Sequence, residues 1–157
     1  MWPTPEGHTS ATPASQHVPY DAHGEELVAG VWEALELPGS ARDYHFVLQD
    51  AVDRLWRARH TYPAALERLE AFALLDLALM EAAPQAVSFD DTDPVAYVRV
   101  SSVPRLINLL EREGAFAEAL AVAQRLTRFE QGEDAVARLS EKAGALAAET
   151  ETAGGAR

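Results

Sequence analysis

Apolar residues recur along the chain at the three- and four-residue spacing of amphipathic helices. The first stripe runs from Leu27 to Leu35 and ends before Pro38, and Ser40 followed by Asp43 has the form of a capping box that starts the next helix. Six helices are predicted, at about 24–37, 40–60, 63–81, 95–113, 115–129 and 133–149. Because the links between them are short, we expect an all-α fold of antiparallel neighbours, either a compact bundle or a short solenoid.

Two of the six helices have unusual patterns. Residues 71–80 (AFALLDLALM) are apolar on most of the helix circumference, which predicts a central helix covered on several sides. Residues 95–100 are rich in valine yet keep a helical stripe, so we favour a helix here, kinked at Pro104, with a short strand as the alternative. Asp93 and Pro94 have the form of an N-cap and first turn for this helix.

The amino-acid composition predicts one folded region with a disordered segment at each end. Residues 1–20 carry four prolines and few apolar residues, so we expect a disordered arm, followed by a single helical domain over 21–149 and a disordered tail over 150–157. The arm has neither the basic residues nor the apolar segment of a secretory signal or transit peptide, so a cytoplasmic location is expected.

Net charge and residue content narrow the classes of partner. A net charge of −12 repels nucleic acid and anionic membranes and favours a basic protein partner. The chain has no cysteine, no pair of histidines at helical metal-site spacing and no phosphate-binding loop, so no metal or other cofactor is expected. An enzyme is unsupported, and a homodimer through a spare apolar helix face stays open.

Residues 46–79 and 100–133 share one pattern at an offset of 54 positions, which aligns Ala65 with Ala119. The second segment contains EREGAFAEALAVAQRL, with a glycine before the turn, an aromatic residue after it and a small residue where paired helices touch. It resembles a tetratricopeptide repeat (TPR), and the first segment resembles a degenerate copy with His60 in place of the glycine. The resemblance implies a protein-binding scaffold with a concave groove. The alternative is that any antiparallel helical hairpin favours these residue types.

Asp76 is the most unusual residue, because it lies on the core face of its predicted helix. A buried carboxylate must be paired, so we expect either a pocket acid with His45 or Tyr44 as partner, or a structural ion pair with Arg99 or Arg105.

The preferred function is a non-catalytic module for binding another protein, such as an adaptor, a scaffold or an immunity-type inhibitor. Arg57, Arg99 and Arg105 are candidate groove contacts, since arginine is common at binding hot spots. The alternative is a small-ligand or enzymatic pocket around Asp76, Tyr44 and His45.

Overall fold

The computed structural model describes residues 2–3, 11–89 and 96–154, and over these residues the fold is all-α, as predicted. It divides into two compact units, Met1–Arg105 and Leu106–Arg157, where a single domain over 21–149 was expected. The two units are described separately below.

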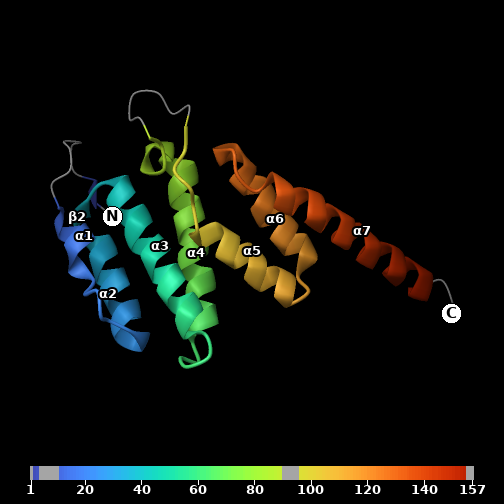
Figure 1. Cartoon of the computed structure of the whole chain (residues 1–157), viewed down its shortest axis with the longest axis horizontal. Helices are drawn as coiled ribbons and strands as arrows, with labels where there is room; N and C mark the ends of the chain where they lie inside the picture. Colours follow the sequence, from blue (N-terminus) through green and yellow to red (C-terminus); the bar gives the residue numbers. More distant parts are fainter. Residues whose placement is uncertain (1, 4–10, 90–95, 155–157) are drawn as a thin grey trace. The chain divides into compact units, whose positions relative to one another are not determined.

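The first unit is a bundle of helices built around α3 (Ala41–Ala58), which lies between α2 (Gly24–Glu36) and α4 (Ala65–Ala82) (Figure 1). The remaining elements are short: α1 (Pro13–His17), the 3₁₀ helix η1 (Pro84–Ala86), and the strands β1 (Trp2–Pro3) and β2 (Pro38–Gly39), which pair in parallel.

The helix starts and core positions of this unit follow from the sequence pattern. Ser40 and Asp43 form the predicted capping box, in which each side chain accepts a hydrogen bond from the backbone N–H of the other residue. The apolar stripes of the three long helices meet in a core in which the largest fully buried side chains are Leu27, Tyr44, Leu48, Leu55, Leu69, Phe72, Leu77 and Met80. Burial of these side chains supplies most of the stabilisation of such a bundle.

The expected disordered arm is wrong for residues 13–17, which form α1. Thr12 and Ser15 cap this helix reciprocally, and Ala14 is fully buried against the backbone of Gly39. A local cap and one buried contact therefore order a segment whose composition alone indicated disorder. Residues 4–10 of the expected arm lie outside the described residues.

The helix favoured over 95–100 is also wrong for the described residues 96–100. Ser88 forms an antiparallel bridge with Tyr97, and the Val98 N–H donates to the Val87 carbonyl over 2.7 Å. The strand alternative was closer, because pairing with residues 87–89, a short distance earlier in the chain, outweighs the helical stripe. The predicted cap at Asp93 and Pro94 lies outside the described residues.

Helix α5 (Ser102–Arg112) begins after this extended segment and crosses the boundary between the two units. Pro104 lies in its first turn, where a missing N–H costs no helical hydrogen bond, so it does not kink the helix.

In the second unit, α6 (Phe116–Leu126) packs against α7 (Glu133–Gly154), with the 3₁₀ helix η2 (Thr127–Phe129) between them (Figure 1). The expected disordered tail is wrong for residues 150–154, because α7 continues to Gly154. Ala65 and Ala119, the two alanines predicted at helix contacts, are both fully buried, each within its own unit.

Candidate functional site

Asp76 lies at the centre of a fully buried polar network. One carboxylate oxygen is 2.7 Å from His45 Nδ1, and the other accepts a hydrogen bond from the Ser102 hydroxyl. The side chains come from α3, α4 and the first turn of α5, and all three residues have 0% exposure. The network therefore joins three helices through a single carboxylate.

The order of the three groups decides what chemistry they can perform. A serine nucleophile needs its hydroxyl beside a base that takes its proton, with an acid behind the base. Here the Ser102 hydroxyl donates to Asp76 and not to His45, and the His45 Nε2 atom is buried with no hydrogen-bond partner. Since no atom of the network is open to solvent, this arrangement joins helices and does not present reactive groups to a substrate.

The predicted partners of Asp76 do not all contact it in the structure. His45 is the partner of Asp76, as one alternative expected. Tyr44 is not, since its hydroxyl donates to the Leu37 carbonyl over 2.8 Å. The ion pair of Asp76 with Arg99 or Arg105 is also wrong: Arg105 binds Asp53, and the neighbouring Ser102 takes the expected place.

Ser102 was missed as a partner because it is a single polar residue within an apolar stripe. Asp76 was noticed because it is a polar residue on an apolar helix face. A search for a second polar residue in such a position would have found Ser102. Arg57 and Arg99 are exposed and lie apart from this network.

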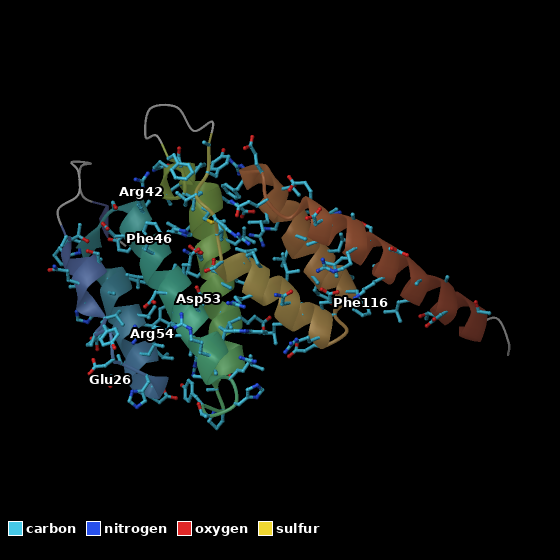
Figure 2. The ribbon with its side chains drawn as sticks, viewed as in Figure 1. Glu26, Arg42, Phe46, Asp53, Arg54 and Phe116 are labelled. Carbon is cyan, nitrogen blue, oxygen red and sulfur yellow. The ribbon has the colours of Figure 1, made fainter. Side chains whose placement is uncertain are left out.

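A second polar cluster fastens the start of α5 to α3. The Ser101 N–H donates to Gln49 and its hydroxyl donates to Asp53, each over 2.7 Å, while Arg105 Nε lies 3.2 Å from the same carboxylate. The guanidinium of Arg105 also lies over the Trp56 ring, 5.4 Å from its centroid. Figure 2 labels Asp53 on α3. These contacts hold the backbone in the position that lets Ser102 reach Asp76.

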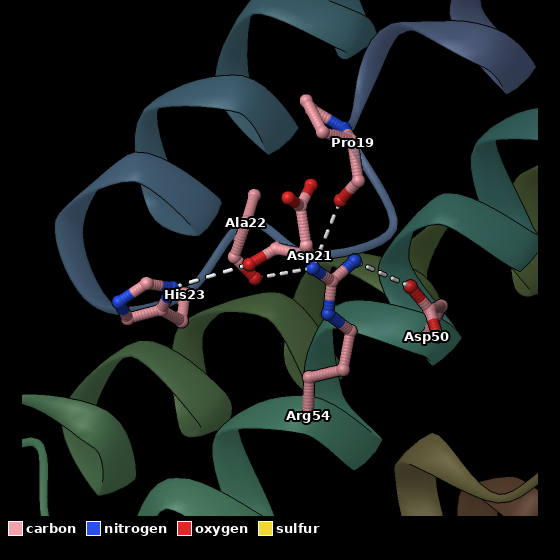
Figure 3. Close-up of polar contacts among 6 residues, drawn as sticks. All are labelled: Pro19, Asp21, Ala22, His23, Asp50 and Arg54. Carbon is pink, nitrogen blue, oxygen red and sulfur yellow. Dashed lines mark hydrogen bonds and ion pairs between the residues drawn. The ribbon is translucent and has the colours of Figure 1, made fainter.

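Arg54 plays a similar structural part on another side of α3. Its guanidinium donates to the carbonyls of Pro19 and Ala22 and pairs with Asp50 at 3.0 Å (Figure 3). The arginine therefore holds the loop between α1 and α2 and pairs with a carboxylate one turn earlier on its own helix.

An exposed apolar surface of the first unit involves α2 and α4. Trp32 of α2 is 46% exposed, and its ring meets Phe72 of α4 edge-on with centroids 5.2 Å apart. On α4, Ala71, Leu74 and Ala78 are exposed and Leu75 is half-buried, and these four residues recur at the i, i+3, i+4 and i+7 spacing of one helix face. We call this set the Trp32 surface; it comprises Trp32, Ala71, Leu74, Leu75 and Ala78.

The Trp32 surface corrects one expectation. The uniformly apolar segment 71–80 predicted a helix covered on several sides, yet Leu74 is 38% exposed and Ala71 and Ala78 are exposed too. The sequence pattern indicated correctly that this face is apolar, and the structure leaves it uncovered in the described residues.

Carboxylates border the Trp32 surface. Exposed Glu25 and Glu36 lie on α2 at either side of Trp32 along the helix, and exposed Glu67 and Glu70 lie on α4. The Tyr62 hydroxyl donates to Glu25, and this bond raises the pKa of Tyr62. Helix α2 has no lysine, arginine or histidine, so the border is strongly acidic.

The second unit has one compact ion network. Glu111 binds Arg138 at 2.8 Å and Lys142 at 2.6 Å, and these two cations lower the pKa of Glu111 to about 2. The network ties α7 to the end of α5 and satisfies its charges internally.

No protein-family model, curated protein or solved structure matches this chain. Among the described residues, no group of three or more histidine, aspartate and glutamate side chains is placed to hold a metal ion, and no helix is both long and apolar enough to cross a membrane.

Proposed function

We propose that this protein is a non-catalytic helical module that binds another protein through the Trp32 surface. The observation that carries the proposal is the exposure of Trp32 and of the apolar residues along one face of α4, since exposed apolar surface on a folded domain commonly marks an interaction site. Tryptophan is among the residue types most enriched at binding hot spots.

The buried network supports a binding function over a pocket. Both oxygens of Asp76 are occupied by side chains of the protein itself, and neither His45 nor Ser102 reaches solvent. A small-ligand or enzymatic site around Asp76, Tyr44 and His45 would require at least one of these groups to be accessible. Their arrangement instead gives the rigid scaffold that a binding surface needs.

The experiment is affinity capture with the full chain and two variants of matched exposure, followed by reconstitution with the purified captured protein. Trp32→Ala removes the largest side chain of the proposed surface, and Phe46→Ala removes an aromatic side chain of 47% exposure on α3. Figure 2 labels Phe46. We expect wild type and Phe46→Ala to form the same complex and Trp32→Ala to lose it. Equal complex formation by all three proteins would refute binding through this surface.

A further inference from the structure

The charges around the Trp32 surface indicate what occupies it. We infer that its occupant is an amphipathic helix of a partner protein, with an apolar stripe bordered by lysine or arginine residues. This inference rests on the proposed function and adds the chemistry of the partner to it.

The shape of the apolar face favours a helix. Residues 71–78 of α4 extend for about 10 Å along the helix axis, roughly two turns, and Trp32 stands beside them on α2. An amphipathic helix presents apolar side chains at positions i, i+3, i+4 and i+7, which cover a face of this length. Leu74 and Leu75 would receive the central anchors of the stripe.

The charge of the border selects a basic partner. Glu25 and Glu36 lie on the α2 side, Glu70 lies at the far edge of the stripe on α4, and Glu67 lies one turn before Ala71, so a helix lying on the apolar face has carboxylates around it. Lysine or arginine at those flanks is attracted, and glutamate is repelled. The only basic side chain on either helix is Arg68, which lies 3.8 Å from Glu67.

The same charges argue against a second copy of this chain as the occupant. A symmetric dimer brings the same patch of both copies together, so the acidic borders of α2 and α4 would face acidic borders. Like charges across an interface oppose association. A basic helix from a different protein meets no such repulsion.

The test is calorimetric titration of the full chain with three synthetic peptides of about 18 residues, a length that can form a helix on binding. The first has a leucine stripe bordered by lysine, the second has the same stripe bordered by glutamate, and the third has the composition of the first in an order that breaks the stripe. We expect only the first to bind, with an affinity that falls by at least about tenfold between low and high salt, because exposed charge pairs are screened.

Two variants locate the binding. Trp32→Ala should weaken binding of the lysine-bordered peptide by at least about tenfold, as expected for a hot-spot residue. Phe46→Ala, which has the same exposed fraction on α3, should change it by no more than about twofold. Glu67→Gln combined with Glu70→Gln should weaken binding and reduce its salt dependence.

Each other outcome has a defined meaning. Equal binding of all three peptides, or tighter binding of the glutamate-bordered one, overturns the basic-helix inference. A dimer in light scattering that Trp32→Ala dissociates overturns it in favour of a second copy. If the peptides do not bind while a captured protein binds wild type and not Trp32→Ala, the proposed function stands and only the partner chemistry is wrong. If Trp32→Ala changes none of these interactions, both fail.

Discussion

Replacing Asp76 with alanine is expected to destabilise the first unit severely. The substitution leaves the His45 Nδ1 and the Ser102 hydroxyl buried with no acceptor. Each orphaned buried donor costs about 1–3 kcal/mol, so the two together cost about 2–6 kcal/mol. We therefore expect a loss of about 2–6 kcal/mol in the free energy of unfolding, a large part of the total stability of a domain this size.

The assay is urea unfolding of the full chain followed by tryptophan fluorescence. All three tryptophans, Trp2, Trp32 and Trp56, belong to the first unit, so the signal reports that unit. Asp53→Ala is the matched control: its carboxylate also binds a serine hydroxyl and a second side chain, but it is 23% exposed. Its loss should cost only about 0.5–1.5 kcal/mol, because water can solvate the groups left behind.

If Asp76→Ala does not fold, a second variant still measures the energy of the buried network. Replacing the whole network, with His45→Leu, Asp76→Leu and Ser102→Ala together, removes every donor and acceptor at once, which is often nearly neutral for buried ionic groups. We expect this variant to fold and to be markedly more stable than Asp76→Ala. A cost below about 1 kcal/mol for Asp76→Ala, or equal costs for Asp76→Ala and Asp53→Ala, would refute the account of a network whose energy depends on burial.

Three further predictions concern other parts of the molecule. A Cβ on Gly39 would lie 2.7 Å from the Ala14 Cβ, so Gly39→Ala should cost about 1–3 kcal/mol in urea unfolding followed by tryptophan fluorescence. Gly144 has open space around it in α7 of the second unit, so Gly144→Ala should gain about 1 kcal/mol in urea unfolding followed by circular dichroism. Effects of the opposite sign would contradict this packing. The ionised Glu111 carboxylate binds two cations in the folded state, which lowers its pKa and stabilises the fold at pH values above about 4.5. Because both cations are substantially exposed, we expect this contribution to be about 1 kcal/mol. It is lost as the pH falls from about 4.5 towards 2 and the carboxylate becomes protonated. Thermal unfolding by circular dichroism should show this loss in wild type and not in Glu111→Gln. Arg54→Met should expose the loop between α1 and α2 to limited proteolysis several-fold faster than in wild type; unchanged cleavage would mean that the arginine does not hold the loop.

Helix positions could be predicted from the sequence where the determinants are local. The capping residues of α3 and the glycines before α6 and α7 mark these ends, and Gly114 and Gly132 both adopt positive φ, which favours glycine. The core face of Asp76 was equally readable, because helical periodicity alone places it there.

The missed features depend on contacts between distant segments. Residues 96–98 are extended because they pair with 87–89, and no local pattern contains that information. Asp76 binds Ser102 and not Arg105 because the extended segment before α5 sets the position at which that helix begins. The exposure of Leu74 depends on which faces of α4 have neighbours, which apolar content cannot reveal.

The TPR resemblance stays a prediction. The buried Ala65 and Ala119 are what it requires, and they are equally what any close-packed helical hairpin requires. The proposed function does not depend on it, since the Trp32 surface is defined by the exposure of its own residues.

The most direct test of the central claim is an NMR titration of the full chain with the lysine-bordered peptide, observing the indole N–H signals of the tryptophans. Trp32 belongs to the proposed surface, while Trp56 packs with Arg59 and Arg105 on another part of the same unit and serves as the internal control. We predict that the Trp32 signal shifts in proportion to bound peptide and that the Trp56 signal stays in place. A shift of Trp56 with no change at Trp32 would contradict the account.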